Sequence, residues 1–315
     1  MRVVTLGYQS WGYRTLSAVL GTEHEVVLAV THPKSDHPYE QMWADSVEEL
    51  AIANGVPVHV ATRADESLID AVRAAEPDVI VANNWRTWLP RALYDAPTHG
   101  TLNIHDSLLP QYAGFSPVLW ALLNRESHVG VTVHRMDEGL DTGPIVAQEA
   151  VPVGPKSTTT ELVLATMDLI EPLVVRSLNG LASGTLREIT QDAGSMTYFH
   201  KRSDRESAID FRSSAADIEL LVRAQSDPYP NAHFTFNDAR IRVLAAHVST
   251  GRFGGTPGRV TVPYEEGVAI VCGASRTTPE PAIVLEQLRL DDGTEVSATD
   301  FFGTRGGYID LVSAG

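Results

Sequence analysis

The chain has 315 residues, of which 43% are hydrophobic and 20% charged, values typical of a globular protein rather than a disordered one. At this length we expect two domains, because a single hydrophobic core rarely serves so many residues. With 24 basic and 40 acidic residues the net charge is −16, which argues against the broad basic surface of proteins that grip nucleic acid.

Strands and helices alternate along the first part of the chain. Apolar β-branched runs predict strands at residues 3–6, 25–30, 58–60, 79–82 and 101–104, and helices are predicted between them at residues 13–20, 46–53 and 66–75. Two β-rich runs at residues 130–134 and 145–153 and a long helix over 159–178 follow. Strands that alternate with helices favour an α/β fold, with a Rossmann-like parallel sheet covered by helices on both faces.

The pattern changes near residue 205. A helix at residues 216–224 precedes short strands with glycine and proline turns, at residues 233–236, 241–248, 258–262 and 268–272. Short strands spaced in this way predict a small OB-like β-barrel. We therefore expect a catalytic domain over residues 1–204 and a C-terminal barrel domain over residues 205–315.

Two features of the sequence bear on the compartment. The N-terminus lacks a secretory signal, and no apolar run reaches the roughly 18 residues that a membrane span needs. The single cysteine, Cys272, excludes an internal disulfide and a zinc site built from several thiolates. These features predict a cytoplasmic protein with no membrane partner.

Polar residues that follow the predicted strands are the place to look for a site, because ligands of open α/β sheets lie beyond the carboxyl ends of the strands. Asn103 and His105 are two residues apart in one strand, so they point the same way, and Asp141 follows 36 residues after His105. Acyl transfer to an amine needs donors for the developing oxyanion and a route for the amine proton. An amide, an imidazole and a carboxylate together meet these needs, although a lone Asn-x-His more often serves only backbone groups.

The surrounding motifs resemble the formyltransferases that use 10-formyltetrahydrofolate. In that family Asn-x-His is followed by Ser-Leu-Leu-Pro and later by Gly-x-Asp-x-Gly, and this chain carries both motifs, at residues 103–110 and 139–143. The resemblance continues into the second domain with Pro-Tyr-Pro-Asn-Ala at residues 228–232 and fades after Arg242. It implies an enzyme, a one-carbon transferase, in which Asn103, His105 and Asp141 are catalytic, 10-formyltetrahydrofolate is the formyl donor and no metal takes part.

The resemblance also implies that the folate lies in a cleft, held largely by backbone groups of the loop after the fourth strand and the loop before Asp141. For Trp85 and Trp88, an ordinary structural place in the core or at its rim is as good an interpretation as contact with the folate. His134 is expected to be structural, and Asp106 stands where many relatives carry a small residue, so its carboxylate is a candidate for tuning His105. The matching cofactor-binding positions are Trp85, Arg86, Thr87, Trp88, Leu89, Ser107, Asp137, Glu138, Gly139 and Leu140.

The acceptor amine is less well defined, because relatives formylate glycinamide ribonucleotide, methionyl-tRNA, amino sugars on nucleotides or hydroxyornithine. The tRNA enzymes carry a basic loop after the second strand, whereas residues 31–47 here contain one lysine, no arginine and three acidic residues. Such a loop repels phosphates, so we expect a small-molecule amine: N-hydroxyornithine for siderophore biosynthesis first, an amino-sugar nucleotide next. Methionyl-tRNA is the alternative acceptor, and a catalytically silent folate-binding protein is the alternative of another class.

Overall fold

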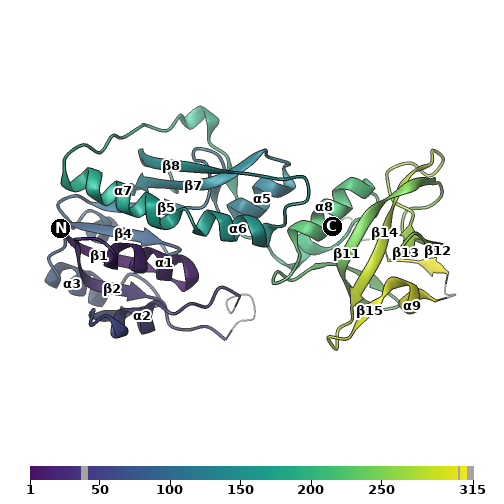
Figure 1. Ribbon diagram of the computed structural model, residues 1–315, viewed down its shortest axis with the longest axis horizontal. Helices are drawn as coiled ribbons and strands as arrows, with labels where there is room; N and C mark the ends of the chain where they lie inside the picture. Colours follow the sequence, from purple (N-terminus) through teal and green to yellow (C-terminus); the bar gives the residue numbers. More distant parts are fainter. Residues whose placement is uncertain (37–41, 304–305, 311–315) are drawn as a thin grey trace. The chain divides into compact units, whose positions relative to one another are not determined.

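The computed structural model describes residues 1–36, 42–303 and 306–310, and the chain forms two compact units (Figure 1). The first unit comprises residues 1–154 and 162–201, and the second comprises residues 155–161 and 202–315. The exact assignment of domains as residues 1–204 and 205–315 stays a proposal.

A seven-stranded sheet forms the centre of the first unit, with the order β3-β2-β1-β4-β5-β7-β8. The first five of these strands are parallel, as predicted, but β7 and β8 run antiparallel to their neighbours. A short loop joins β7 to β8, and such a connection permits only antiparallel pairing, so the sheet is mixed. The strands are β1 (Arg2–Gly7), β2 (Glu25–Thr31), β3 (Val58–Val60), β4 (Val79–Asn83), β5 (Thr101–His105), β7 (His128–Arg135) and β8 (Ile145–Pro152).

Helices cover both faces of this sheet. Leu68 of α3 packs with Leu6 and Val30 in one buried cluster, and Leu16 of α1 packs with Val47 of α2 in another. No helix in the described part of the chain is long and apolar enough to cross a membrane. The helices are α1 (Gln9–Leu20), α2 (Val47–Ala53), α3 (Glu66–Ala74), α4 (Arg91–Tyr94), α5 (Pro117–Leu123), α6 (Thr159–Met167) and α7 (Ile170–Ala182).

Two local features differ from the sequence-based prediction. The helix expected over residues 159–178 is two helices, because the Leu169 amide bonds to the Thr166 carbonyl three residues back and interrupts the regular ladder. A two-stranded parallel sheet of β6 (Ala113–Gly114) and β9 (Tyr198–Phe199) was not expected. This small sheet holds a late segment of the unit against the loop that follows β5.

The second unit is a curled antiparallel sheet of order β10-β11-β14-β13-β12-β16, with β15 paired to β14. Register shifts between β11 and β14 bend the strands, and the Asp310 amide bonds to the Thr235 carbonyl of β10 at 3.1 Å, so the two edges meet. This closure confirms the predicted barrel. Its elements are α8 (Ala215–Ala224), β10 (Ala232–Phe236), β11 (Ala239–Phe253), β12 (Arg259–Tyr264), β13 (Gly267–Ile270), β14 (Glu280–Arg289), β15 (Glu295–Ser297), α9 (Ala298–Phe302) and β16 (Gly307–Tyr308).

Candidate active site

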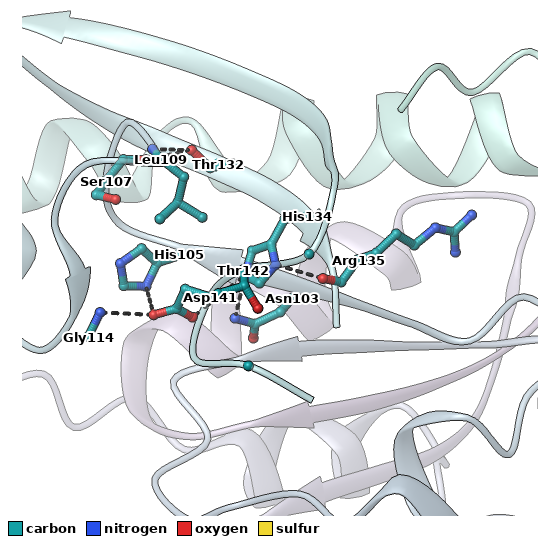
Figure 2. Close-up of polar contacts among 12 residues, drawn as sticks. Asn103, His105, Ser107, Leu109, Gly114, Thr132, His134, Arg135, Asp141 and Thr142 are labelled. Atoms are coloured by element: carbon teal, nitrogen blue, oxygen red, sulfur yellow. Dashed lines mark hydrogen bonds and ion pairs between the residues drawn. The ribbon is translucent and has the colours of Figure 1, made fainter. Parts of the chain in front are cut away.

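The carboxyl end of β5 positions the predicted pair Asn103 and His105 (Figure 2). This strand lies between β4 and β7, so the backbone on both sides fixes it. Asn103 is half-buried and His105 is only 9% exposed. A strand held from both sides gives the amide and the imidazole a more precise position than a loop would.

A backbone carbonyl sets the tautomer of His105. Its Nε2 lies 2.9 Å from the Tyr112 carbonyl oxygen, which can only accept, so Nε2 carries a proton and donates it. The second proton of the ring therefore comes and goes at Nδ1. Nδ1 lies 3.7 Å from Asp141 Oδ2, so His105 presents its changeable proton on the side of that carboxylate.

Asp141 is held in a left-handed backbone conformation, with φ 57°. Its Oδ2 accepts a hydrogen bond from the Gly114 amide at 2.9 Å, and its Oδ1 lies 3.6 Å from His134 Nε2. Burial by itself would raise the pKa of Asp141, but the charge of His105, the neighbouring His134 ring and the bond from the Gly114 amide outweigh it and bring this pKa to about 2. The carboxylate is therefore ionised at neutral pH.

The loop around Asp141 requires both of its glycines. A Cβ atom at Gly139 would lie 2.0 Å from Thr142 Oγ1, and one at Gly143 would lie 1.9 Å from the Arg135 carbonyl oxygen. Neither position has room for a side chain. The Gly-x-Asp-x-Gly motif is thus explained by the close packing that turns Asp141 toward His105.

His134 contacts two of the three predicted catalytic residues, which the sequence interpretation did not foresee. Its Nδ1 donates to the Arg135 carbonyl at 2.7 Å, so Nε2 is the nitrogen that accepts from Asn103 Nδ2, at 3.0 Å. His134 is only 2% exposed. The antiparallel register, in which Asn103 faces His134, brings them together, and this register cannot be read from the sequence.

Gln191 is a second residue that the sequence did not reveal. Its Nε2 donates to the carbonyls of Asp141 and Gly143, at 2.8 and 2.7 Å. A residue far along the chain therefore holds the loop that carries the candidate catalytic carboxylate. No motif surrounds Gln191, so nothing in the sequence could have pointed to it.

The two loops predicted to hold the folate lie side by side. Trp85 and Leu89 of the loop after β4 pack in the same buried cluster as Met136, which begins the loop before Asp141. Trp88 is 64% exposed and Leu140 is 42% exposed. Exposed apolar side chains beside polar loop backbone suit a flat, partly polar ring, so the predicted positions fit a pteridine.

Several of the predicted folate residues have roles within the protein. Trp85 stacks on His32 with ring centroids 3.9 Å apart, and Arg86 donates to Gln9 Oε1 at 2.8 Å. Leu89 is a core residue, as its packing shows. The others are placed as follows: Thr87 and Glu138 are exposed, Ser107 Oγ donates to the Gln111 carbonyl, and Asp137 Oδ1 accepts from the Gly139 amide and Thr142 Oγ1.

Both units match one protein family. Residues 1–178 match formyl transferase, and residues 201–306 match the C-terminal domain of formyl transferase. The chain belongs to the formyl transferase family. Formyltransferases are enzymes that take the formyl group from 10-formyltetrahydrofolate, so the predicted enzyme class and formyl donor are confirmed. Among the described residues no three His, Cys, Asp or Glu side chains are placed to hold a metal, and metal-free catalysis stays a prediction.

Curated relatives correct the expected acceptor. The methionyl-tRNA formyltransferase of Pseudomonas putida (strain GB-1) is 33% identical over 309 residues, covering 97% of this chain and 96% of that protein. The methionyl-tRNA formyltransferase of Ectopseudomonas mendocina (strain ymp) is 32% identical, covering 97% and 95%. The prediction of N-hydroxyornithine or an amino-sugar nucleotide is therefore wrong. It rested on the acidic net charge and on the loop at residues 31–47, of which residues 37–41 lie outside the described residues.

Solved structures share the fold. An N-formyltransferase from Helicobacter canadensis has a TM-score of 0.67 at 19% identity and covers 90% of this chain and 98% of its own. The methionyl-tRNA formyltransferase from Clostridium thermocellum has a TM-score of 0.53 at 17% identity, covering 87% of this chain and 100% of its own. At these identities the likeness concerns the fold and does not bear on the acceptor.

Proposed function

We propose that this formyltransferase moves the formyl group of 10-formyltetrahydrofolate onto the amino group of methionyl-tRNA. The observation that carries the proposal is the 33% identity to a methionyl-tRNA formyltransferase, spread over 97% of the chain. An alignment of that extent includes the barrel unit as well as the catalytic one. The acceptor that the acidic composition disfavoured is thus the one that the relatives support.

Asn103 and His105 are proposed to bind the oxyanion that forms when the amine attacks the formyl carbon. One proton of Asn103 Nδ2 is directed to His134 Nε2, which leaves the second proton of this amide for the oxyanion. His105 donates from Nδ1, because Nε2 is bonded to the Tyr112 carbonyl. Two donors fixed before the reaction stabilise the transition state without reorganisation.

Asp141 is proposed to keep His105 charged and then to accept the amine proton through water. With a pKa of about 2 it is a weak base while His105 is positive. When His105 gives its proton to the oxyanion, the charge that lowers the pKa of Asp141 disappears, and the carboxylate becomes a better base. The amine nitrogen forms the new bond to the formyl carbon, and the bond from that carbon to folate breaks. As the carbonyl re-forms, its oxygen returns the proton to His105, and the amine proton held by Asp141 passes through water to the departing tetrahydrofolate.

The loops at residues 84–89 and 137–140 are proposed to hold the folate. The exposed side chains of Trp88 and Leu140 are best placed to cover its ring, since their neighbours Trp85 and Leu89 pack inward. The donor supplies the formyl group, and the chain's own residues orient it and exclude water.

Formyl transfer by the purified protein tests this proposal. Methionyl-tRNA, uncharged tRNA, free methionine and an amino-sugar nucleotide are compared at matched concentrations with 10-formyltetrahydrofolate as donor. We expect turnover with methionyl-tRNA alone. Turnover with the amino-sugar nucleotide and none with methionyl-tRNA would reject the proposed acceptor while leaving the donor chemistry intact.

A further inference from the structure

Two aromatic side chains near the candidate catalytic carboxylate are exposed to solvent. Phe115 is 50% exposed and Tyr198 is 57% exposed. They come from segments far apart in the sequence, which the two-stranded sheet of β6 and β9 brings together. Single exposed apolar residues are common, but two aromatic rings gathered beside a site indicate a binding surface.

The backbone of β6 connects this surface to the site. The Phe115 amide points to β9 and bonds to the Phe199 carbonyl at 2.9 Å. The Gly114 amide, one residue earlier, points the opposite way and bonds to Asp141 Oδ2 at 2.9 Å, as Figure 2 shows. The strand β6 therefore lies between β9 and the candidate catalytic carboxylate.

The register places both exposed residues on one face of the small sheet. Tyr198 pairs with Ala113, and Phe115 lies two residues after Ala113. Side chains alternate along a strand, so these three residues share a face. Neighbouring strands are only about 4.8 Å apart, so the rings of Phe115 and Tyr198 contribute to one surface, which we call the aromatic platform.

A second layer of rings supports the platform. Phe199 stacks on Tyr112, with ring centroids 4.8 Å apart and an angle of 15° between the planes. Trp120 packs against Phe199 at 5.3 Å, and its Nε1 donates to the His200 carbonyl at 3.1 Å. These contacts hold the two backbone segments that carry the exposed rings, so the platform is ordered before a ligand binds.

The chemistry of the proposed acceptor determines what lies near the platform. The methionine of methionyl-tRNA is esterified to the terminal adenosine, so this nucleoside is only a few bonds from the amine that must reach Asp141. Every base has a flat face that stacks on aromatic rings, and stacking does not depend on a basic surface. A chain with a net charge of −16 attracts phosphates weakly, so an uncharged contact suits the acceptor end.

We propose that Phe115 and Tyr198 form a stacking platform for the unpaired terminal adenine of the acceptor tRNA. The inference rests on methionyl-tRNA as the acceptor and adds the residues that hold its end. Because the Gly114 amide beside the platform bonds to Asp141, a base stacked there would bring the attached amino acid close to this carboxylate. The two rings thus bind the substrate and take no part in proton transfer.

Equilibrium binding of uncharged tRNA tests the platform without catalysis. The probes are a methionine-accepting tRNA and the same tRNA without its terminal adenosine. We expect the wild type to bind the complete tRNA about tenfold more tightly, and the double variant Phe115→Leu, Tyr198→Leu to bind both probes equally. Leucine keeps an apolar side chain but lacks a flat ring. An undiminished preference in the folded double variant would overturn the proposal.

Conservative replacements distinguish stacking from packing. Phe115→Tyr and Tyr198→Phe keep the flat ring and should keep the preference for the complete tRNA. Ile52→Ala is the matched control, because Ile52 is 65% exposed and the turn after α2 leads into the start of β3, at the edge of the sheet opposite the site. If the aromatic replacements lose the preference as completely as leucine does, the rings do not act by stacking and the proposal is rejected.

Steady-state kinetics separate failure of the platform from failure of the proposed acceptor. In Phe115→Leu we expect KM for methionyl-tRNA to rise about tenfold, with kcat within about twofold of wild type and KM for 10-formyltetrahydrofolate unchanged. A rise in KM for the folate alone would place the ring at the donor and reject the platform. An unchanged KM for methionyl-tRNA would reject the platform only, whereas a wild type without activity on methionyl-tRNA would reject the acceptor as well.

Discussion

His105 and His134 each use one ring nitrogen to bond a backbone carbonyl, which leaves the other nitrogen facing Asp141. The protein thereby decides where each ring can gain or lose a proton. Asp141 lies between the two rings, 3.7 and 3.6 Å from the nearest nitrogens. The negative charge of Asp141 therefore lies beside His105, which is proposed to donate a hydrogen bond to the oxyanion.

Asn103→Ala tests the amide of the oxyanion site. Removing one donor of this kind lowers kcat by about a hundredfold to a thousandfold, and we expect that loss here with little change in KM. Steady-state kinetics with methionyl-tRNA measure both constants. A variant that kept kcat within a few fold of wild type would show that Asn103 does not contact the oxyanion.

Asp141→Asn tests the electrostatics of the site through stability. The folded pKa of Asp141 is about 2, below the ordinary 3.8, so its ionised form stabilises the fold above pH 4 and this contribution is lost as pH falls toward 2. The difference in free energy of unfolding between wild type and variant should shrink by about 2 kcal/mol between pH 5 and pH 2.5. Urea unfolding over this range measures it, and a constant difference would contradict the assigned shift.

Some residues of the site could be predicted from sequence and others could not, for physical reasons. Asn103 and His105 follow from the two-residue period of a strand, and Asp141 from a motif whose glycines have no room for a side chain. His134 and Gln191 depend on strand register and on a late segment folding back. Neither of these leaves a local pattern.

The loop between β7 and β8 is the element on which the site depends most. In Gly143→Ala the new methyl group would lie 1.9 Å from a backbone oxygen, so the loop must move and carry Asp141 away from His105. We expect kcat to fall at least about tenfold, because even a small displacement of a catalytic group lowers the reaction rate strongly. Gly21→Ala is the control, since its nearest contact would be 3.5 Å and its backbone has a φ of −78°, and it should keep full activity.

At the scale of elements, regular segments were predicted well and short ones were not. The alternation over β1 to β5 is visible in apolar runs, because each buried strand is a continuous hydrophobic segment. The strands β6 and β9 have two residues each, too few to show a period, and they exist through pairing. The break between α6 and α7 arises from one irregular turn of hydrogen bonds. The amino-acid composition of this stretch gives no sign of it.

At the scale of the whole molecule, net charge proved a poor guide to the acceptor. A charge of −16 describes solubility and long-range repulsion, whereas recognition depends on where a few groups lie. The prediction of a small-molecule acceptor came from total charge, and the methionyl-tRNA formyltransferases that align with 97% of this chain contradict it.

The acidic composition still leads to a measurable expectation for the proposed acceptor. If only about two lysine or arginine side chains contact phosphates of the tRNA, KM for methionyl-tRNA should rise by no more than about tenfold between 50 and 200 mM salt. Steady-state assays at several salt concentrations measure the slope. A rise of about a thousandfold would indicate a local basic surface that the net charge conceals.

The return of a late segment to the catalytic loop limits how the enzyme can be shortened. Gln191 holds the carbonyls of Asp141 and Gly143, and Phe199 pairs with Gly114, whose amide bonds Asp141. A catalytic fragment cut at residue 178, where the match to formyl transferase ends, would lose both supports. Minimal versions of this enzyme, for engineering or for crystallisation, should therefore extend through Lys201.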